Sequence, residues 1–244
     1  WGVADPSNIW KHDGRYFVLT GNLLVLNKYG RAATAPAAEQ GDRLDLFVSD
    51  DLRAWRHLHV FYERRPEWTD ASEDNMCPSF LPLPAAPDGG PPSGKHLLLF
   101  IAHNKGCQYY LGNYRDDRFF PDHHGRMSWV DNGYFAPEAL LDGGGRQIMW
   151  AWLIDRRDGD EQSGWTGVYG LPRTLWLGDD GTLRMRPVPE LEALRLHERT
   201  WRGMVVDEAE GAVDAGPRAG TGHGRERERA GTYPLEGVVG DSCE

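Results

Sequence analysis

Residues 95–102, Lys95-His96-Leu97-Leu98-Leu99-Phe100-Ile101-Ala102, contain the longest apolar run of the chain, which extends from Leu97 to Ala102. A helix that crosses a lipid bilayer needs about 20 apolar residues, so this run is far too short to span a membrane. A short apolar run of this kind is instead typical of a buried β-strand. We therefore expect a strand over residues 95–102 and no association with a membrane.

Short apolar stretches of the same kind recur along the chain and are separated by Gly, Asp and Pro. The further strands that we expect are Tyr16 to Thr20, Asp45 to Val48, His57 to Tyr62, Gln108 to Tyr114, Gln147 to Ile154 and Leu171 to Leu177. Turn residues bound them, for example Asp13-Gly14 and Asp179-Asp180-Gly181. Since no segment before about residue 188 keeps a helical period over three turns, the sequence predicts an all-β protein.

Many short strands with regular turns are typical of a sandwich, a barrel or a propeller. Repeated strand–turn–strand modules that carry aromatic residues favour the propeller, and so does Ser49 to Trp55, which we expect to be a turn between two outer blade strands. A sandwich is the alternative.

The composition indicates a globular protein and excludes one class of partner. Hydrophobic residues make up 40% of the 244 residues and charged residues 26%, which allows a sizeable core. The formal net charge is -10. A protein that binds nucleic acid should present a basic face to the phosphates, and the sequence contains no basic cluster, so we expect no nucleic-acid partner.

The three cysteines, Cys77, Cys107 and Cys243, lie far apart, which argues against a structural zinc site. Cys77 and Cys107 form either a disulfide or two buried free thiols, and the free thiols are the favoured interpretation. The adjacent pair His123-His124 lies among Pro and Gly residues and is typical of a solvated loop. We expect neither a metal nor a cofactor.

Several motifs in the second half of the chain occur in a recognisable order. They are Tyr134-Phe135-Ala136-Pro137-Glu138-Ala139-Leu140-Leu141-Asp142, Gly145-Arg146-Gln147-Ile148-Met149-Trp150-Ala151-Trp152-Leu153, Gly164-Trp165-Thr166-Gly167, Leu171-Pro172-Arg173 and Arg186-Pro187-Val188-Pro189-Glu190-Leu191. This ordered series resembles glycoside hydrolase family 32, the invertases, levanases and related fructosidases. The resemblance covers about Asp5 to Leu196.

The resemblance implies a five-bladed β-propeller followed by a β-sandwich. We expect residues 1–186 to form a partial catalytic propeller that lacks its N-terminal blade, with 187–232 as a partly disordered linker. One or two helical turns are expected between Pro187 and Arg195. Residues 233–244 resemble the beginning of the sandwich, so the chain is expected to be truncated at both ends. A propeller without a blade leaves strand edges unpaired, and we expect this chain alone to be inactive and prone to aggregate.

The resemblance also implies a retaining reaction in which carboxylates surround an oxocarbenium-like transition state. Ala4-Asp5-Pro6 resembles the family's Arg-Asp-Pro motif, with Ala4 in place of Arg. This assigns Asp5 to sugar binding and to electrostatic stabilisation of the transition state. The alternative is that Asp5 is the nucleophile, whose family motif is Asn-Asp-Pro-Asn-Gly. In the favoured interpretation the nucleophile belongs to the missing blade.

The proton donor departs from the family pattern. Met76-Cys77-Pro78-Ser79-Phe80 stands where the family has Glu-Cys-Pro-Asp-Phe, and a methionine cannot donate a proton. Strand alternation places Asp74 on the same face as Met76, and Glu73 could take the role if the strand bulges. The alternative is that Glu73 and Asp74 are ordinary turn residues.

Three further residues are assigned to substrate binding: Glu138, where the family usually has Gln, Trp165 and Asn8. Trp150 and Trp152 share one face of a strand, where core packing is favoured over stacking on a sugar. The predicted function is a glycoside hydrolase acting on β-fructofuranosides such as sucrose or fructans, with a carbohydrate as its partner. The alternative, motivated by Met76, is a carbohydrate-binding propeller with impaired catalysis.

Overall fold

The computed structural model describes residues 5–21, 40–128, 132–154 and 164–196. Within these ranges the chain forms strands β1 to β13 and a short 3-10 helix, η4 (Pro189–Leu194). The predicted all-β class is confirmed, and η4 lies inside the segment for which one or two helical turns were expected. Residues 197–244, which include the expected sandwich segment and Cys243, lie outside the described residues.

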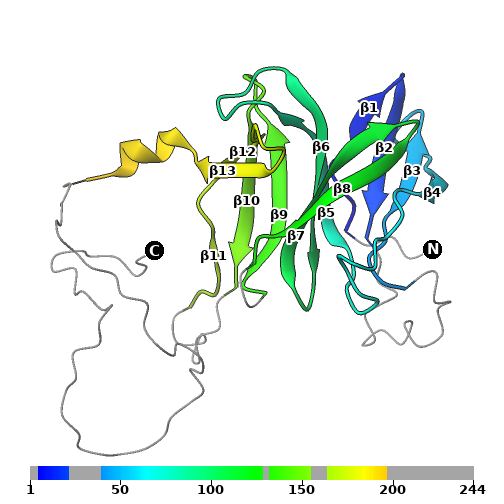
Figure 1. Ribbon diagram of the computed structural model, residues 1–244, viewed down its shortest axis with the longest axis horizontal. Helices are drawn as coiled ribbons and strands as arrows, with labels where there is room; N and C mark the ends of the chain where they lie inside the picture. The colour runs from blue at the N-terminus through cyan, green and yellow to red at the C-terminus, as the bar shows by residue number, and fades with distance from the viewer. Residues whose placement is uncertain (1–4, 22–39, 129–131, 155–163, 197–244) are drawn as a thin grey trace, which may run out of the picture. The chain divides into compact units, whose positions relative to one another are not determined.

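The strands form three antiparallel sheets (Figure 1). Sheet A contains β1 (Trp10–His12), β2 (Arg15–Thr20), β3 (Asp45–Ser49) and β4 (Arg56–Val60). Sheet B contains β5 (Met76–Pro84), β6 (Pro92–Ala102), β7 (Gly106–Arg115) and β8 (Arg118–Arg126). Sheet C contains β9 (Tyr134–Leu141), β10 (Gln147–Leu153), β11 (Val168–Tyr169), β12 (Arg173–Leu177) and β13 (Leu183–Pro187). In each sheet the strands follow the chain order outward from the first strand, except that β11 and β12 both pair with β10.

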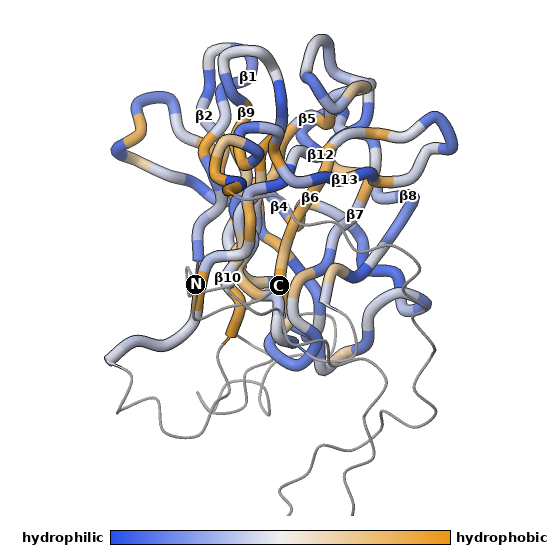
Figure 2. The backbone as a smooth tube through the Cα atoms, turned by 90° about the vertical axis from the view of Figure 1, so that its left-hand side faces the viewer, coloured by the Kyte–Doolittle hydropathy of each residue, from blue (hydrophilic) through white to orange (hydrophobic). Residues whose placement is uncertain are grey.

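Sheet B lies between sheets A and C, and each of its faces contributes to a hydrophobic core. Leu98 and Phe100 of β6 pack in a cluster with residues of sheet A, whereas Leu97, Leu99 and Ile101 pack in a second cluster with residues of sheet C. A strand that is buried on both faces carries a continuous apolar run, which explains the composition of β6. Figure 2 shows this strand as one of the most hydrophobic segments of the chain.

A buried polar cluster holds the loop before β3 to sheet B. Asp42 accepts hydrogen bonds from Tyr62, Tyr110, Asn75 (3.0 Å) and Thr69 (3.2 Å). Burial raises the pKa of the Asp42 carboxyl, while the four donors act in the opposite direction. Because these donors come from distant parts of the chain, the cluster fixes the packing of sheet A against sheet B.

The first strands of the three sheets are neighbours, and side chains join them at matching positions. Asn8 precedes β1, donates to the carbonyl oxygen of Phe80 in β5 (2.9 Å) and accepts from the Phe80 amide (2.7 Å). Ser79 in β5 accepts a hydrogen bond from the Ala139 amide in β9 (3.2 Å). These hydrogen bonds therefore join the segment before β1 to β5, and β5 to β9.

All seven strands expected from the sequence are present, with small shifts of their ends. The turn expected at Ser49 to Trp55 joins β3 to β4, the two outer strands of sheet A, and Asp51 accepts backbone hydrogen bonds within it. Cys77 and Cys107 are free thiols, which agrees with the favoured interpretation. Among the described residues, no helix is long and apolar enough to cross a membrane.

Candidate active site

The same unusual backbone feature occurs in the segment before β1 and in the first strands of sheets B and C. Asp5, Cys77 and Ala136 each precede a proline and each adopt a positive φ, of 44°, 49° and 46° respectively. The residue before a proline normally takes an extended conformation, and a left-handed conformation costs about 1–3 kcal/mol for a residue other than glycine. Strain that recurs at the same kind of step in three segments, two of which are in contact, indicates a functional position.

Two of these strained residues touch each other. The Cys77 thiol lies 3.4 Å from Oδ2 of Asp5 and donates to that carboxylate. Burial, together with the negative charge of Asp5, raises the pKa of the Cys77 thiol to about 12. The thiol is therefore protonated at neutral pH and acts as a hydrogen-bond donor to Asp5.

A second carboxyl group lies beside this pair. Glu138 follows Ala136 and Pro137 in β9, and its register partner in β10 is Trp150. Burial, and then the charge of Asp5, raise the pKa of Glu138 to about 7. Glu138 also contributes to the raised pKa of Cys77, so the three groups sense one another electrostatically. Two carboxyl groups with different environments are the arrangement from which acid and base roles arise.

Glu138 lines a hollow of about 540 Å³ on sheet C. The other residues around this hollow are Ala136, Trp150, Ala151, Trp152, Thr166, Gly167, Val168 and Tyr169. Trp152 is 40% exposed and Tyr169 is 82% exposed, so aromatic surface is open to solvent. A hollow with aromatic walls and a carboxyl group suits a sugar, because the C–H face of the ring packs on an aromatic side chain while its hydroxyls bind polar groups.

Gly167 fixes the position of Trp152. Its φ is +70°, and a Cβ at this position would lie 2.1 Å from Nε1 of the Trp152 indole. Only glycine allows this close approach together with this backbone conformation. The glycine therefore lets the backbone just before β11 approach Trp152, which forms one wall of the hollow.

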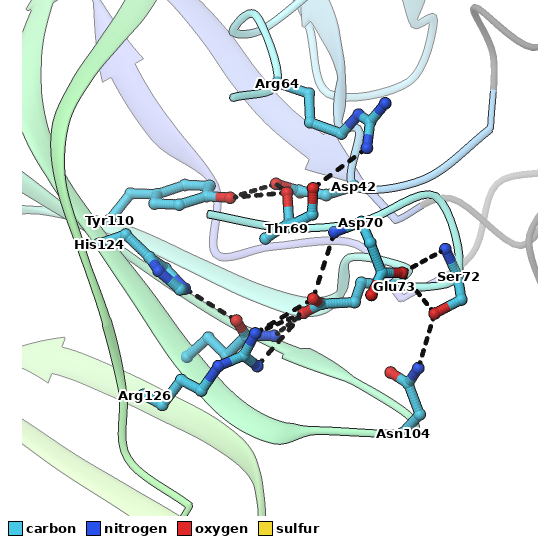
Figure 3. Close-up of polar contacts among 11 residues, drawn as sticks. Asp42, Arg64, Thr69, Asp70, Ser72, Glu73, Asn104, Tyr110, His124 and Arg126 are labelled. Carbon is cyan, nitrogen blue, oxygen red and sulfur yellow. Dashed lines mark hydrogen bonds and ion pairs between the residues drawn. The ribbon is translucent and has the colours of Figure 1, made fainter. Parts of the chain in front are cut away.

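Glu73 does not belong to this site, contrary to the prediction. Its side chain is buried and forms an ion pair with the Arg126 guanidinium, with Nη2 of Arg126 3.1 Å from Oε1. Gln108 donates to Glu73 at 2.9 Å, and the Asp70 amide donates at 3.3 Å (Figure 3). His124 is hydrogen bonded to Gln108 in turn. Glu73 thus belongs to an internal network of sheet B.

Asp74 is also buried, and both of its oxygens bind His103. The His103 amide donates to Oδ1 at 2.8 Å, and Nδ1 of the His103 ring lies 2.6 Å from Oδ2. The strand-alternation argument for Asp74 is wrong because β5 begins only at Met76. Asp74 lies near enough to Cys77 for its charge to raise the thiol's pKa, but its oxygens serve to hold His103.

Met76 lies in the hydrophobic cluster between sheets B and C, where it is 4% exposed. The pairing of β5 with β6 shifts register between Met76 and Ser79, at the left-handed Cys77. The thioether is thus part of the core and cannot take part in proton transfer.

The remaining predicted residues have mixed outcomes. Asn8 uses both atoms of its amide group to join the inner strands, so the structure gives it a structural role instead of substrate binding. Trp165 is 40% exposed, but its neighbours Thr166 and Gly167, and not Trp165 itself, line the hollow. Trp150 and Trp152 line the hollow and belong to neither core cluster, so the expected core packing is wrong for both.

Cys77 is the site residue that sequence reasoning missed. Its signal is the repeated X-Pro step in Asp5-Pro6, Cys77-Pro78 and Ala136-Pro137. The contact between Asp5 and Cys77 and the contact between Asn8 and Phe80 both span 72 residues. The segment before β1 therefore runs beside the beginning of β5 with a constant offset.

The described features agree with comparisons to known proteins. The sequence profile described as "Glycosyl hydrolases family 32 N-terminal domain" matches residues 3–187. The insoluble isoenzyme 4 of β-fructofuranosidase from Oryza sativa subsp. japonica is 30% identical over 219 residues, covering 82% of this chain and 34% of its own length. A fructan 1-exohydrolase from Leymus chinensis is 29% identical over 226 residues, covering 84% of this chain and 34% of its own. The chain thus spans about a third of the length of the curated relatives it matches.

Solved structures share the fold. A variant of fructan 1-exohydrolase IIa from Cichorium intybus, in complex with 1-kestose, superposes with a TM-score of 0.61 at 21% identity, covering 79% of this chain and 36% of that one. A variant of a GH32 β-fructofuranosidase from Bombyx mori, in complex with sucrose, superposes with a TM-score of 0.56 at 22% identity, covering 80% of this chain and 40% of that one.

Proposed function

Because the chain belongs to glycosyl hydrolase family 32, we propose that the complete protein cleaves β-fructofuranosidic bonds such as those of sucrose or fructans. The observation that supports this most directly is the contact of the Asp5 carboxylate with Cys77, together with Glu138, which lines a hollow with tryptophan walls and whose pKa the charge of Asp5 helps to raise. The names of the relatives, β-fructofuranosidase and fructan 1-exohydrolase, give the substrate class.

Asp5 stabilises positive charge on the fructosyl ring. The reaction passes through an oxocarbenium-like transition state, and the overall stereochemistry is retained. A fixed carboxylate is worth most where charge develops, because it needs no reorganisation during the reaction. The hydrogen bond from Cys77 and the left-handed backbone hold Asp5 in one orientation.

The proposed architecture is a five-bladed propeller, of which sheets A, B and C are three blades. A ring of five takes two further sheets, one more than the single missing blade expected from the sequence. The proposed catalytic part ends near residue 186, and the expected sandwich segment at 233–244 lies outside the described residues. The nucleophile comes from outside the described residues, and the 244-residue chain alone is inactive.

Turnover of sucrose and inulin by the complete gene product tests the function. We expect Asp5→Ala to lower kcat/KM by about 10²- to 10³-fold, the usual effect of losing one preorganised electrostatic group. Asp13→Asn is the matched control, because Asp13 lies in the same sheet, has an exposed side chain (78%) and adopts a positive φ that Asn tolerates. Unchanged turnover in Asp5→Ala would exclude the proposed role of Asp5.

A second candidate function is a carbohydrate-binding propeller without catalysis, which the buried Met76 favours. This function predicts that fructosides bind to the complete gene product and are not cleaved. Calorimetry with fructose, alongside the turnover assay, separates the two.

A further inference from the structure

We propose that Glu138 is the proton donor of this site, in place of the glutamate that Met76 replaces. This inference rests on the proposed function and assigns one chemical role within it. It moves the acid from the first strand of sheet B to the first strand of sheet C.

The reaction needs a carboxylic acid that reaches the leaving oxygen. Met76 lies in the core, and the two acidic residues before it are buried with partners that occupy their oxygens. Glu73 is paired with Arg126, and Asp74 with His103. Carboxyl oxygens that are held by internal partners in this way do not face a substrate.

Glu138 meets the requirements that these residues fail. It lines the hollow together with Trp150 and Trp152, and it is the register partner of Trp150 across the strand pair. Among the described residues, the ionisable groups that interact with Glu138 are Asp5 and Cys77, and neither is a cation. Glu138 therefore lies beside the carboxylate proposed to face the sugar ring.

The environment of Glu138 also gives it a suitable acidity. Although the residue is open to solvent on the side of the hollow, partial desolvation, followed by the charge of Asp5, raises its pKa to about 7. A general acid works best when its pKa lies near the working pH. Glu138 then supplies the proton and Asp5 faces the sugar ring, a division of roles that other pairs of carboxyl groups also show.

The proton balance of both steps is complete. In the first step the Glu138 carboxylic acid transfers its proton to the glycosidic oxygen while the bond from that oxygen to the fructosyl C2 breaks. The leaving sugar departs as an alcohol, and a carboxylate nucleophile from outside the described residues forms an ester bond to C2. In the second step water attacks C2 and releases the nucleophile, and the Glu138 carboxylate takes the proton of that water.

The test compares two leaving groups on the complete gene product. A nitrophenyl β-fructofuranoside releases a nitrophenolate, which departs without protonation, whereas sucrose requires an acid. For Glu138→Gln we expect kcat/KM for sucrose to fall by about 10²- to 10⁴-fold. Its kcat/KM for the nitrophenyl fructoside should change little, because this parameter reports formation of the fructosyl-enzyme. Azide should raise kcat of this variant by attacking C2 in place of activated water.

Matched variants separate this proposal from its rivals. Asp5→Asn should lose activity on both substrates, since it acts on the ring and not on the leaving group. In Asp74→Asn and in Glu73→Gln, kcat/KM should change by the same factor for sucrose and for the nitrophenyl fructoside. Wild-type kcat/KM for sucrose should decline above about pH 7, and Glu138→Gln should lack this decline.

Three results overturn the proposal. In the first, Glu138→Gln cleaves sucrose at the wild-type rate. In the second, Asp74→Asn or Glu73→Gln shows the leaving-group dependence instead. In the third, the kcat/KM of Glu138→Gln falls equally for both substrates while its melting temperature stays at the wild-type value. Wild-type protein that cleaves no fructoside would overturn the proposed function itself, which is a different outcome from any of these.

Discussion

Replacement of Arg126 by Met should destabilise the protein without acting on the chemistry. The guanidinium forms an ion pair with the buried Glu73 side chain, which is 2% exposed, whereas the Arg126 side chain is 33% exposed. Removal of one partner from a buried ion pair costs about 3–5 kcal/mol. Because Arg126 is partly solvated, and Gln108 and the Asp70 amide still donate to Glu73, we expect the free energy of unfolding to fall by about 3 kcal/mol, the lower end of this range.

Chemical and thermal denaturation, followed by tryptophan fluorescence, measure this loss. For a domain of this size, about 3 kcal/mol corresponds to a decrease in Tm of about 6–12 °C. Adding Glu73→Gln to Arg126→Met should recover part of the stability, because the unpaired buried charge is then removed. Arg184→Met is the matched control, since Arg184 pairs with Asp180 where both side chains are 51% exposed and such pairs are worth about 0–1 kcal/mol.

A loss below about 1 kcal/mol in Arg126→Met would refute the reasoning, because that is the value of a surface ion pair. Failure of the double variant to recover stability would show that Arg126 acts through packing and not through its charge. Either result would reopen Glu73 as a candidate for a functional role.

Two further predictions concern the fold and the hollow. Burial lowers the pKa of His96 to about 4, so the folded state resists protonation and stability should decrease as pH falls from about 6.5 toward 4. Denaturation curves over this range should show a weaker pH dependence of stability in His96→Phe than in the wild type. An equal pH dependence would exclude His96 as its source. Gly167→Ala should displace the Trp152 indole, at a cost of about 1–3 kcal/mol for the left-handed backbone, and weaken fructose binding measured by tryptophan quenching. Unchanged quenching in Gly167→Ala would show that Trp152 does not contact the sugar.

The sequence predicted the strands whose apolar residues stand out and missed those that contain prolines or polar residues. The run that became β6 was predictable because both faces of that strand are buried. By contrast, β5, β8 and β9 contain Pro78, Pro121 and Pro137, which interrupt the patterns by which strands are identified. These prolines lie in strands whose pairing shifts register or whose backbone is left-handed at the preceding residue.

The site was only partly predictable, for a physical reason. Asp5 and Glu138 were identified from motifs, and in the structure the charge of Asp5 helps to raise the pKa of Glu138. Glu73 and Asp74 were assigned to the chemistry from their place before Met76. Their structural partners, Arg126 and His103, lie 53 and 29 residues away in the sequence, so the sequence near Met76 did not reveal them. A carboxylate's role depends on such distant partners, which local patterns do not reveal.

Trp150 and Trp152 show the same limit in a different form. Alternation along the strand placed the two indoles on one face, which agrees with their shared hollow. Whether that face is covered depends on contacts from outside the strand, such as the close approach of Gly167 to Trp152. Strand periodicity alone does not contain this information.

A crystal structure of the complete gene product with bound fructose tests the convergence of Asp5 and Glu138 most directly. We expect one fructosyl unit whose hydroxyls are hydrogen bonded to the Asp5 carboxylate, with the Glu138 carboxyl next to the anomeric oxygen and an indole of the hollow beside the ring. Fructose bound elsewhere, or bound without contact to either carboxyl group, would contradict the proposed site.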